Sequence, residues 1–306
     1  MRLVFIATGD IALPAFRHLI DAGPRPLALV TQPDKPVGRH QIMQASAIKA
    51  AAIEADIPVL QPQKIGDAAD QIAAIDPDIL VVMAYGQILK KDILSLPKLA
   101  IINLHASLLP KYRGAACIQA AIDAGDRESG ITSMHVVREL DAGDMIVAKP
   151  IPIEPDETGG SLHDRLAQLA IPVLDETLAK LADGSAARTP QNPEHVSHVP
   201  KLERDDGKLD WSMPAAKLER RIRAYDPWPG TYTTVLENGS AKRLKIFPPT
   251  RISDIPLRLG MISCDDGKLI VGCGDGSLEL TMVQPEGGKR MSATDYLRGK
   301  KPEHFA

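Results

Sequence analysis

Three polar residues in the first half of the chain, Asn103, His105 and Asp141, have the chemistry needed to move an acyl group. Asn103 and His105 lie two residues apart in the apolar run 100–106, so a strand would place both side chains on one face. Asp141 belongs to the segment RELDAGD, which follows a second apolar run. An amide and an imidazolium can stabilise an oxyanion, and a carboxylate can raise the imidazole pKa and relay protons. An amine acceptor would make a nucleophilic Ser or Cys unnecessary, although a His in a buried strand is more often a core residue.

These residues have to be positioned by a sheet, and the first 155 residues predict one. Short apolar runs rich in β-branched residues alternate there with amphipathic segments. Strands are expected at 3–8, 26–32, 78–84, 100–106, 130–137 and 144–153, and helices at 11–19 and 45–55. The runs at 78–84 and 100–106 show no regular alternation of apolar and polar residues, which is typical of strands covered on both sides. The pattern predicts an α/β fold with a doubly wound, mostly parallel sheet, whose ligands bind beyond the carboxyl ends of the strands.

The remainder of the chain predicts a long helix, a linker and a smaller second domain. Ser161 is a suitable N-cap for a helix in which Leu recurs at helical spacing. Polar, Pro-rich sequence predicts a linker over 190–207, between a first domain at 1–189 and a second at 208–306. Short strand-like runs in the second domain indicate a small β-barrel or sandwich, and they read GTYTTVL, KRLKIF, GMISC, KLIVGC and SLELTMV.

Composition and missing motifs exclude several classes of protein. The three cysteines among 306 residues form no CxxC pair, which excludes a disulfide scaffold and a thiolate zinc site. No apolar run reaches the length of a membrane span, and the first residues predict a strand instead of a signal peptide, so we expect a cytoplasmic protein. The turn ATGDIA lacks the glycine patterns of nicotinamide dehydrogenases and nucleotide hydrolases, and no His and Cys cluster predicts a metal.

The net charge of −3 is unevenly divided along the chain. Residues 201–306 hold 18 basic and 15 acidic residues, a net charge of +3, which leaves −6 on the rest. The division favours a second domain that tolerates phosphate, although ordinary surface variation accounts for it equally well.

The segments around the three polar residues resemble the folate-dependent formyltransferases. The likeness rests on NLHASLLPKYRGAACIQ and on ELDAGDMI, in which Asp141 lies 38 residues after Asn103. These enzymes transfer a formyl group from 10-formyltetrahydrofolate to an amine, with the Asn, the His and the Asp of this pattern in the active site. The resemblance implies that Asn103, His105 and Asp141 are catalytic and that no metal takes part. The folate contacts that it implies are Ser107, Leu108, Leu109 and Pro110, with Tyr85 and Gly86 along the same pocket.

The second domain resembles that of family members whose acceptor is the methionine carried by initiator tRNA. The likeness is carried by 200–233, with DGKLDW and IRAYDPWPG, and by 283–300. It implies an OB-like barrel and an enzyme that formylates the α-amine of this methionine for translation initiation, and we expect a monomer. Trp211 and Trp228 are expected to pack at the start of this domain, with base stacking as the alternative. The implied tRNA contacts are Arg39, Lys217, Arg220, Arg221 and Arg223, of which the last four also fit a solvated helix face.

The sequence leaves the acceptor of the formyl group open. After Gly38 and Arg39 the chain has His40, Gln41 and Ile42, where the family commonly has a small residue and two lysines that enter the acceptor stem. A formyltransferase acting on an amino sugar nucleotide would share the catalytic residues, and a non-catalytic folate- or tRNA-binding relative would share the fold. The cation-rich helix favours tRNA over the sugar nucleotide, and the intact catalytic set argues against a non-catalytic relative.

Overall fold

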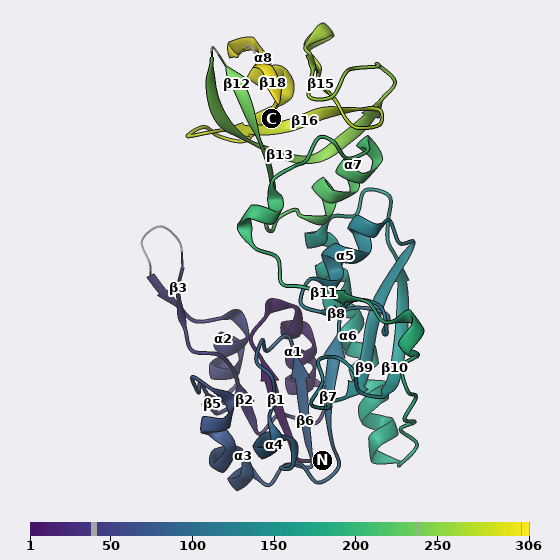
Figure 1. The fold of residues 1–306 in the computed structure, drawn as a ribbon. Helices are drawn as coiled ribbons and strands as arrows, with labels where there is room; N and C mark the ends of the chain where they lie inside the picture. The colour runs from purple at the N-terminus through teal and green to yellow at the C-terminus, as the bar shows by residue number, and fades with distance from the viewer. Residues whose placement is uncertain (38–41, 238, 301, 306) are drawn as a thin grey trace. The chain divides into compact units, whose positions relative to one another are not determined.

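The computed structural model describes residues 1–37, 42–237, 239–300 and 302–305 (Figure 1). The chain divides into two compact units. Unit 1 comprises Met1–Gly114, Ser129–Ile151 and His163–Val199, and unit 2 comprises Ala115–Glu128, Pro152–Leu162 and Pro200–Ala306. Two short segments that precede residue 163 thus belong to unit 2. Among the described residues, no helix combines the length and the apolar character needed to cross a bilayer.

Unit 1 is built on a seven-stranded sheet. Its strands are β1 (Leu3–Ala7), β2 (Ala28–Val30), β5 (Val59–Leu60), β6 (Ile79–Met83), β7 (Ala100–His105), β9 (Glu128–His135) and β10 (Met145–Pro152). The order across the sheet is β10-β9-β7-β6-β1-β2-β5. The pairs from β7 to β5 are parallel, and β9 runs antiparallel to β7. The predicted mostly parallel sheet is confirmed, with β5 as an additional strand at its edge.

Helices cover both faces of this sheet. They are α1 (Leu13–Asp21), α2 (Ala47–Glu54), α3 (Ala69–Ile75), α4 (Lys91–Leu94) and α6 (Gly159–Ala182). On one face, Phe5 of β1 packs on Phe16 of α1 with ring centroids 5.3 Å apart. On the other face, Ile6 of β1 belongs to a buried cluster with Ile72 of α3 and Ile93 of α4. Because neighbouring residues of one strand pack under helices on opposite faces, the doubly wound arrangement is confirmed.

Short elements complete the described structure. β3 (Lys35–Val37) and β4 (Ile42–Gln44) form an antiparallel pair, and β8 (Arg113–Gly114) pairs in parallel with β11 (His198–Val199). The single-turn 3-10 helices are η1 (Asp10–Ala12), η2 (Ile65–Ala68), η3 (Pro193–His195), η4 (Arg204–Gly207) and η5 (Asp265–Gly267). The β8–β11 pair matters for the site, because it ties residues after α6 to the loop that follows β7.

The long helix begins earlier than the sequence predicted. α6 starts at Gly159, so Ser161 lies in its first turn. Thr158 Oγ1 accepts a hydrogen bond from Ser161 N at 3.1 Å, and Ser161 Oγ accepts one from Thr158 N at 3.0 Å. This reciprocal pair is a capping box in which Thr158 is the cap. The prediction of Ser161 as N-cap is therefore wrong, because Ser161 is the inner partner of the box.

Unit 2 contains a nearly closed, barrel-like antiparallel sheet. Its strands are β12 (Thr231–Glu237), β13 (Ser240–Ser253), β14 (Ile262–Ser263), β15 (Leu269–Gly272), β16 (Ser277–Pro285), β17 (Met291–Ser292) and β18 (Pro302–Phe305). The order is β14-β15-β16-β13-β12-β18, with β17 beside β16, and an isolated bridge from Met261 to His304 joins the two edges. Helices α5 (Cys117–Ala124), α7 (Ala215–Ala224) and α8 (Ala293–Gly299) belong to the same unit. The predicted small barrel is confirmed.

The two tryptophans of unit 2 have different surroundings. Trp211 is 4% exposed, donates from Nε1 to Thr233 Oγ1 at 2.9 Å, and lies 5.4 Å from the ring of Phe305. Its predicted packing role is confirmed. Trp228 is 49% exposed, so the prediction that it packs in the same way is wrong.

Candidate active site

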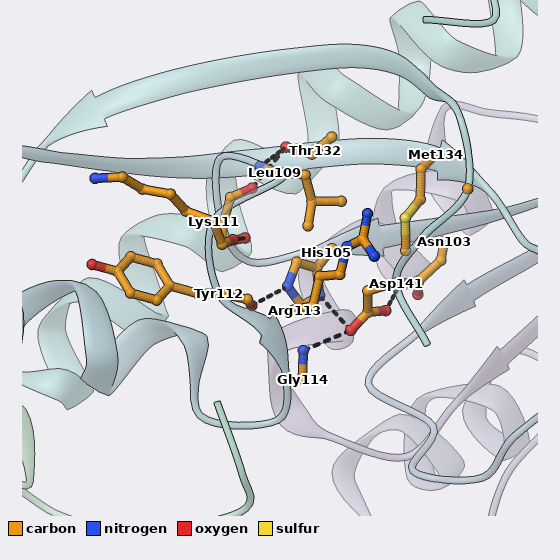
Figure 2. A network of polar contacts seen from close by, with 12 residues as sticks. Asn103, His105, Leu109, Lys111, Tyr112, Arg113, Gly114, Thr132, Met134 and Asp141 are labelled. Carbon is orange, nitrogen blue, oxygen red and sulfur yellow. Dashed lines mark hydrogen bonds and ion pairs between the residues drawn. The ribbon is translucent and has the colours of Figure 1, made fainter. Parts of the chain in front are cut away.

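Asn103 and His105 project from the carboxyl end of β7 on one face of the sheet (Figure 2). In the antiparallel register with β9, Asn103 lies opposite Met134 and His105 lies opposite Thr132. Residues directly opposite in such a pair share a face, so these four side chains line one patch of the sheet. The His105 side chain is only 8% exposed, which removes most water from around its ring.

The contacts of His105 determine which ring nitrogen carries a hydrogen. Its Nε2 lies 2.9 Å from the backbone oxygen of Tyr112. A carbonyl oxygen can only accept, so Nε2 is the donor in this contact. Nδ1 faces Asp141 Oδ2 at 3.6 Å. A proton on Nδ1 would give an imidazolium whose positive charge the neighbouring carboxylate stabilises.

Asp141 is fixed by its backbone and by its side chain. Its φ of 51° lies in the left-handed region, which lets the turn point the carboxylate back toward β7. Oδ2 accepts a hydrogen bond from Gly114 N at 2.9 Å, and Oδ1 lies 3.5 Å from Asn103 Nδ2. The carboxylate therefore contacts the amide of Asn103 and the imidazole of His105 at the same time.

The second acidic residue of this turn points elsewhere. Asp144 Oδ2 lies 3.7 Å from Arg188 Nη1, and its side chain is 35% exposed, against 11% for Asp141. Of the two aspartates in the segment, Asp141 is the one that the structure brings to His105. Asp144 thus offers a matched control for substitutions at Asp141.

The loop after β7 is folded tightly against β9. Ser107 Oγ donates to Lys111 O at 2.7 Å, and the Leu109 amide donates to Thr132 Oγ1 at 3.1 Å. Thr132 Oγ1 in turn donates to Ser107 O at 2.7 Å, and the Leu109–Pro110 peptide is cis. These bonds fix the backbone of the loop against β9.

Comparisons with known proteins agree with this geometry. Residues 1–178 match the family model described as "Formyl transferase", and residues 201–301 match "Formyl transferase, C-terminal domain". The chain belongs to the formyltransferase family. The resemblance inferred from the sequence is therefore confirmed, as is the expectation of a formyltransferase-type α/β domain followed by an OB-like barrel.

Individual relatives extend the comparison to the full length of this formyltransferase. It is 48% identical to the methionyl-tRNA formyltransferase of Akkermansia muciniphila, over 100% of this chain and 99% of the relative. The N-formyltransferase of Helicobacter canadensis, solved with folinic acid and dTDP-3-aminofucose, is 18% identical with a TM-score of 0.67, over 92% of this chain and 98% of that one. HypX of Aquifex aeolicus, solved with tetrahydrofolic acid, is 17% identical with a TM-score of 0.64, and this chain spans 47% of its length. The two solved structures show a shared fold.

The residues beside Asn103, His105 and Asp141 have the chemistry of a folate site. Leu108 and Pro110 are partly exposed in the loop that directly follows His105, so apolar surface and hydrogen-bonding groups occur in one segment, as small-molecule sites require. Gly130 keeps β9 close to this loop, since a Cβ there would lie 2.5 Å from a Leu108 side-chain atom. The folate contacts assigned to 107–110 remain a prediction.

Tyr85 and Gly86 lie beyond β6, and the phenol of Tyr85 belongs to the core. Tyr85 is 2% exposed within the buried cluster that includes Ile93, and burial raises its pKa to about 12. Its hydroxyl has no hydrogen-bond partner among the described residues, while its backbone oxygen accepts from Gln32 Nε2 at 2.6 Å. At Gly86, with φ of 82°, a Cβ would lie 2.9 Å from that same Gln32 nitrogen. Any folate contact here would therefore use the backbone.

Four of the five cations predicted to contact tRNA make ion pairs and hydrogen bonds within unit 2. Lys217 Nζ lies 2.9 Å and Arg221 Nη2 3.1 Å from Asp123 Oδ2 of α5, and Arg220 Nε donates to Asp123 O. Arg223 pairs with Glu219 at 2.5 Å and donates to Glu157 O. Contact of this cluster with tRNA stays a prediction. Arg39, the remaining residue of that set, lies outside the described residues.

The structure adds groups to the site that sequence reasoning missed. Tyr112 and Gly114 contribute backbone atoms, which no pattern of side chains could have signalled. Gln191 contributes an amide, and it lies in the polar stretch that the sequence assigned to a linker. The sequence around Gln191 is polar and has a proline on either side, a composition that indicates a loop and gives no sign of a contact with the site.

Proposed function

We propose that this formyltransferase transfers the formyl group of 10-formyltetrahydrofolate to the α-amine of methionine on initiator tRNA. The observation that carries this proposal is the 48% identity, end to end, with a methionyl-tRNA formyltransferase. The arrangement of Asn103, His105 and Asp141 supplies the chemistry that the reaction needs. A cytoplasmic location and a monomeric state fit this function and remain predictions.

10-Formyltetrahydrofolate supplies an electrophilic formyl carbon and leaves as tetrahydrofolate. As the amine attacks that carbon, negative charge develops on the formyl oxygen. Asn103 Nδ2 lies at a long 3.5 Å from Asp141 Oδ1, so it can turn and donate to this oxygen. The His105 imidazolium adds positive charge in a site with little water, where such charge is most effective.

Asp141 has two roles in the proposed mechanism. It stabilises the imidazolium of His105, and through water it accepts the proton that the attacking amine loses. The bond from the amine nitrogen to the formyl carbon forms, and the bond from that carbon to the folate nitrogen breaks. The folate nitrogen gains a proton as it leaves, so the proton count balances with no change in the protein.

The barrel offers exposed cations for the tRNA backbone. Arg243 and Lys245 of β13 are exposed, and Arg243 stacks 3.4 Å from the ring centroid of Tyr232 on β12. In the β12–β13 register, Lys245 lies opposite Tyr232, so the two cations share one outer face. We assign the phosphate contacts to this face in preference to the cations of α7, because Asp123 and Glu219 already pair with several of those cations.

The acceptor is tested by offering three amines in parallel with 10-formyltetrahydrofolate. These are methionyl-initiator tRNA, methionyl-elongator tRNA and an amino sugar nucleotide. Rapid formylation of the initiator alone is the expected result. Formylation of the sugar nucleotide would show that the acceptor is wrong while the donor is right. Folate binding without formylation of any acceptor would favour a non-catalytic relative.

A further inference from the structure

The segment that follows α6 returns to the active site. Met145 and Thr189 exchange both backbone hydrogen bonds, at 2.9 and 3.1 Å, next to the turn that carries Asp141. Further on, β11 pairs with β8, and Tyr112 N donates to Ser197 Oγ at 2.8 Å. Residues 189–199 therefore contact both the turn after β9 and the loop after β7.

Gln191 lies between these two contacts, and both ends of its side-chain amide form hydrogen bonds. Nε2 donates to Asp141 O and to Gly143 O, each at 2.8 Å. Oε1 accepts from Arg113 Nε at 3.0 Å and from Arg113 Nη2 at 2.8 Å. Both hydrogens and both lone pairs are thus satisfied. The guanidinium also fixes the orientation of the amide, because a flipped amide would turn its NH2 toward Arg113.

The turn bonded by Gln191 is one that needs support. Asp141 has a left-handed φ of 51°, a conformation that costs a non-glycine residue free energy. Gly143 packs so closely on β9 that a Cβ there would lie 1.7 Å from His135 O. The two carbonyls that Gln191 satisfies flank this strained stretch, so its amide holds the backbone from which the Asp141 carboxylate projects.

We propose that Gln191 is a positioning residue that sets the distance between Asp141 and His105. Through Arg113, it links the turn after β9 to the loop that presents Tyr112 O to His105 and Gly114 N to Asp141. The two ends of the catalytic set are then fixed to each other by one side chain. This inference rests on the proposed function, since it assigns Gln191 to the same reaction.

Single-turnover formylation by Gln191→Ala, Gln191→Glu and Asn192→Ala tests the proposal. Gln191→Ala should slow transfer about 10- to 100-fold, because small displacements of a catalytic group are costly, with KM for the folate changed less than about threefold. Gln191→Glu keeps an acceptor for Arg113 but turns an oxygen toward the two carbonyls, so it should fold normally and lose rate. Asn192 caps η3 and does not reach the site, so Asn192→Ala should keep the wild-type rate within about twofold.

A double-mutant cycle separates positioning from a structural role. In an Asp141→Asn background, Gln191→Ala should cause little further loss, because Gln191 acts through Asp141. Additive losses, or a Gln191→Ala rate within threefold of wild type, would overturn the proposal.

A second readout does not depend on the acceptor. Hydrogen exchange at the Gly114 amide should be about tenfold faster in Gln191→Ala and unchanged in Asn192→Ala. Unchanged exchange in Gln191→Ala would also overturn the proposal. If the wild type formylates no acceptor, the proposed function fails, and the Gly114 exchange rate still decides whether Gln191 positions Asp141.

Discussion

Replacing Asp141 with asparagine removes a charge from the site and leaves the size of the side chain unchanged. At the observed 3.6 Å between Oδ2 and His105 Nδ1, a unit charge pair is worth about 5 kcal/mol at an effective dielectric constant of about 20. The new amide also disturbs its surroundings. With Asn103 as it stands, either placement of the new NH2 faces a donor, Gly114 N or Asn103 Nδ2, so Asn103 has to turn over to give it an acceptor. Since each 1.4 kcal/mol is a factor of ten, we expect formyl transfer to slow by about 10³-fold.

The rate is best measured by rapid quench in a single turnover, with enzyme in excess and both substrates bound. Asp144→Asn is the matched control, since Asp144 belongs to the same turn but faces Arg188, and its rate should stay within about twofold of wild type. Thermal unfolding of both variants shows whether the fold is retained. A folded Asp141→Asn enzyme with a rate within tenfold of wild type would refute the role given to this carboxylate.

Three further predictions concern the core and the barrel. Tyr85→Phe removes a buried hydroxyl that has no hydrogen-bond partner among the described residues. The variant should be as stable as wild type in denaturant unfolding, or more stable by up to about 1 kcal/mol. KM for the folate should not change, and a raised KM would show that the phenol contacts the folate. Burial, followed by the charge of Arg188, lowers the pKa of His135, so below about pH 6.5 the unfolded state binds more protons than the folded state. The free energy of unfolding measured in urea should therefore be lower at pH 5.5 than at pH 7.5, and the difference should be smaller in His135→Gln. Exchanging Arg243 and Lys245 for Gln should reduce the slope of log Kd against log salt for tRNA by about 2, and an unchanged slope would remove this face from the interface.

Much of the fold was predictable because its signals are local. Apolar runs without regular alternation of polar residues mark β6 and β7 as strands buried on both sides, and the observed layers follow from that pattern. The shared face of Asn103 and His105 follows from the two-residue period of a strand alone. The start of α6 was harder to predict, because Thr158 and Ser161 are both good capping residues and only their reciprocal bonds decide between them.

The parts that could not be predicted depend on contacts between distant segments. Asp123 lies 94 residues before Lys217, so no property of the α7 sequence shows that its cations face an acidic partner. Gln191 lies 50 residues after Asp141, in a stretch whose composition indicates only a loop. The oxygen that accepts the hydrogen bond from His105 Nε2 is the backbone oxygen of Tyr112, and backbone groups carry no sequence signal.

The proposed mechanism is tested by the single-turnover rate of formyl transfer to methionyl-initiator tRNA by His105→Ala, compared with wild type. Loss of the imidazolium beside the developing oxyanion should slow transfer by about 100- to 1,000-fold, while folate binding is largely retained. A folded His105→Ala enzyme that binds the folate and transfers the formyl group at a rate within a few-fold of wild type would show that the imidazole does not stabilise the oxyanion.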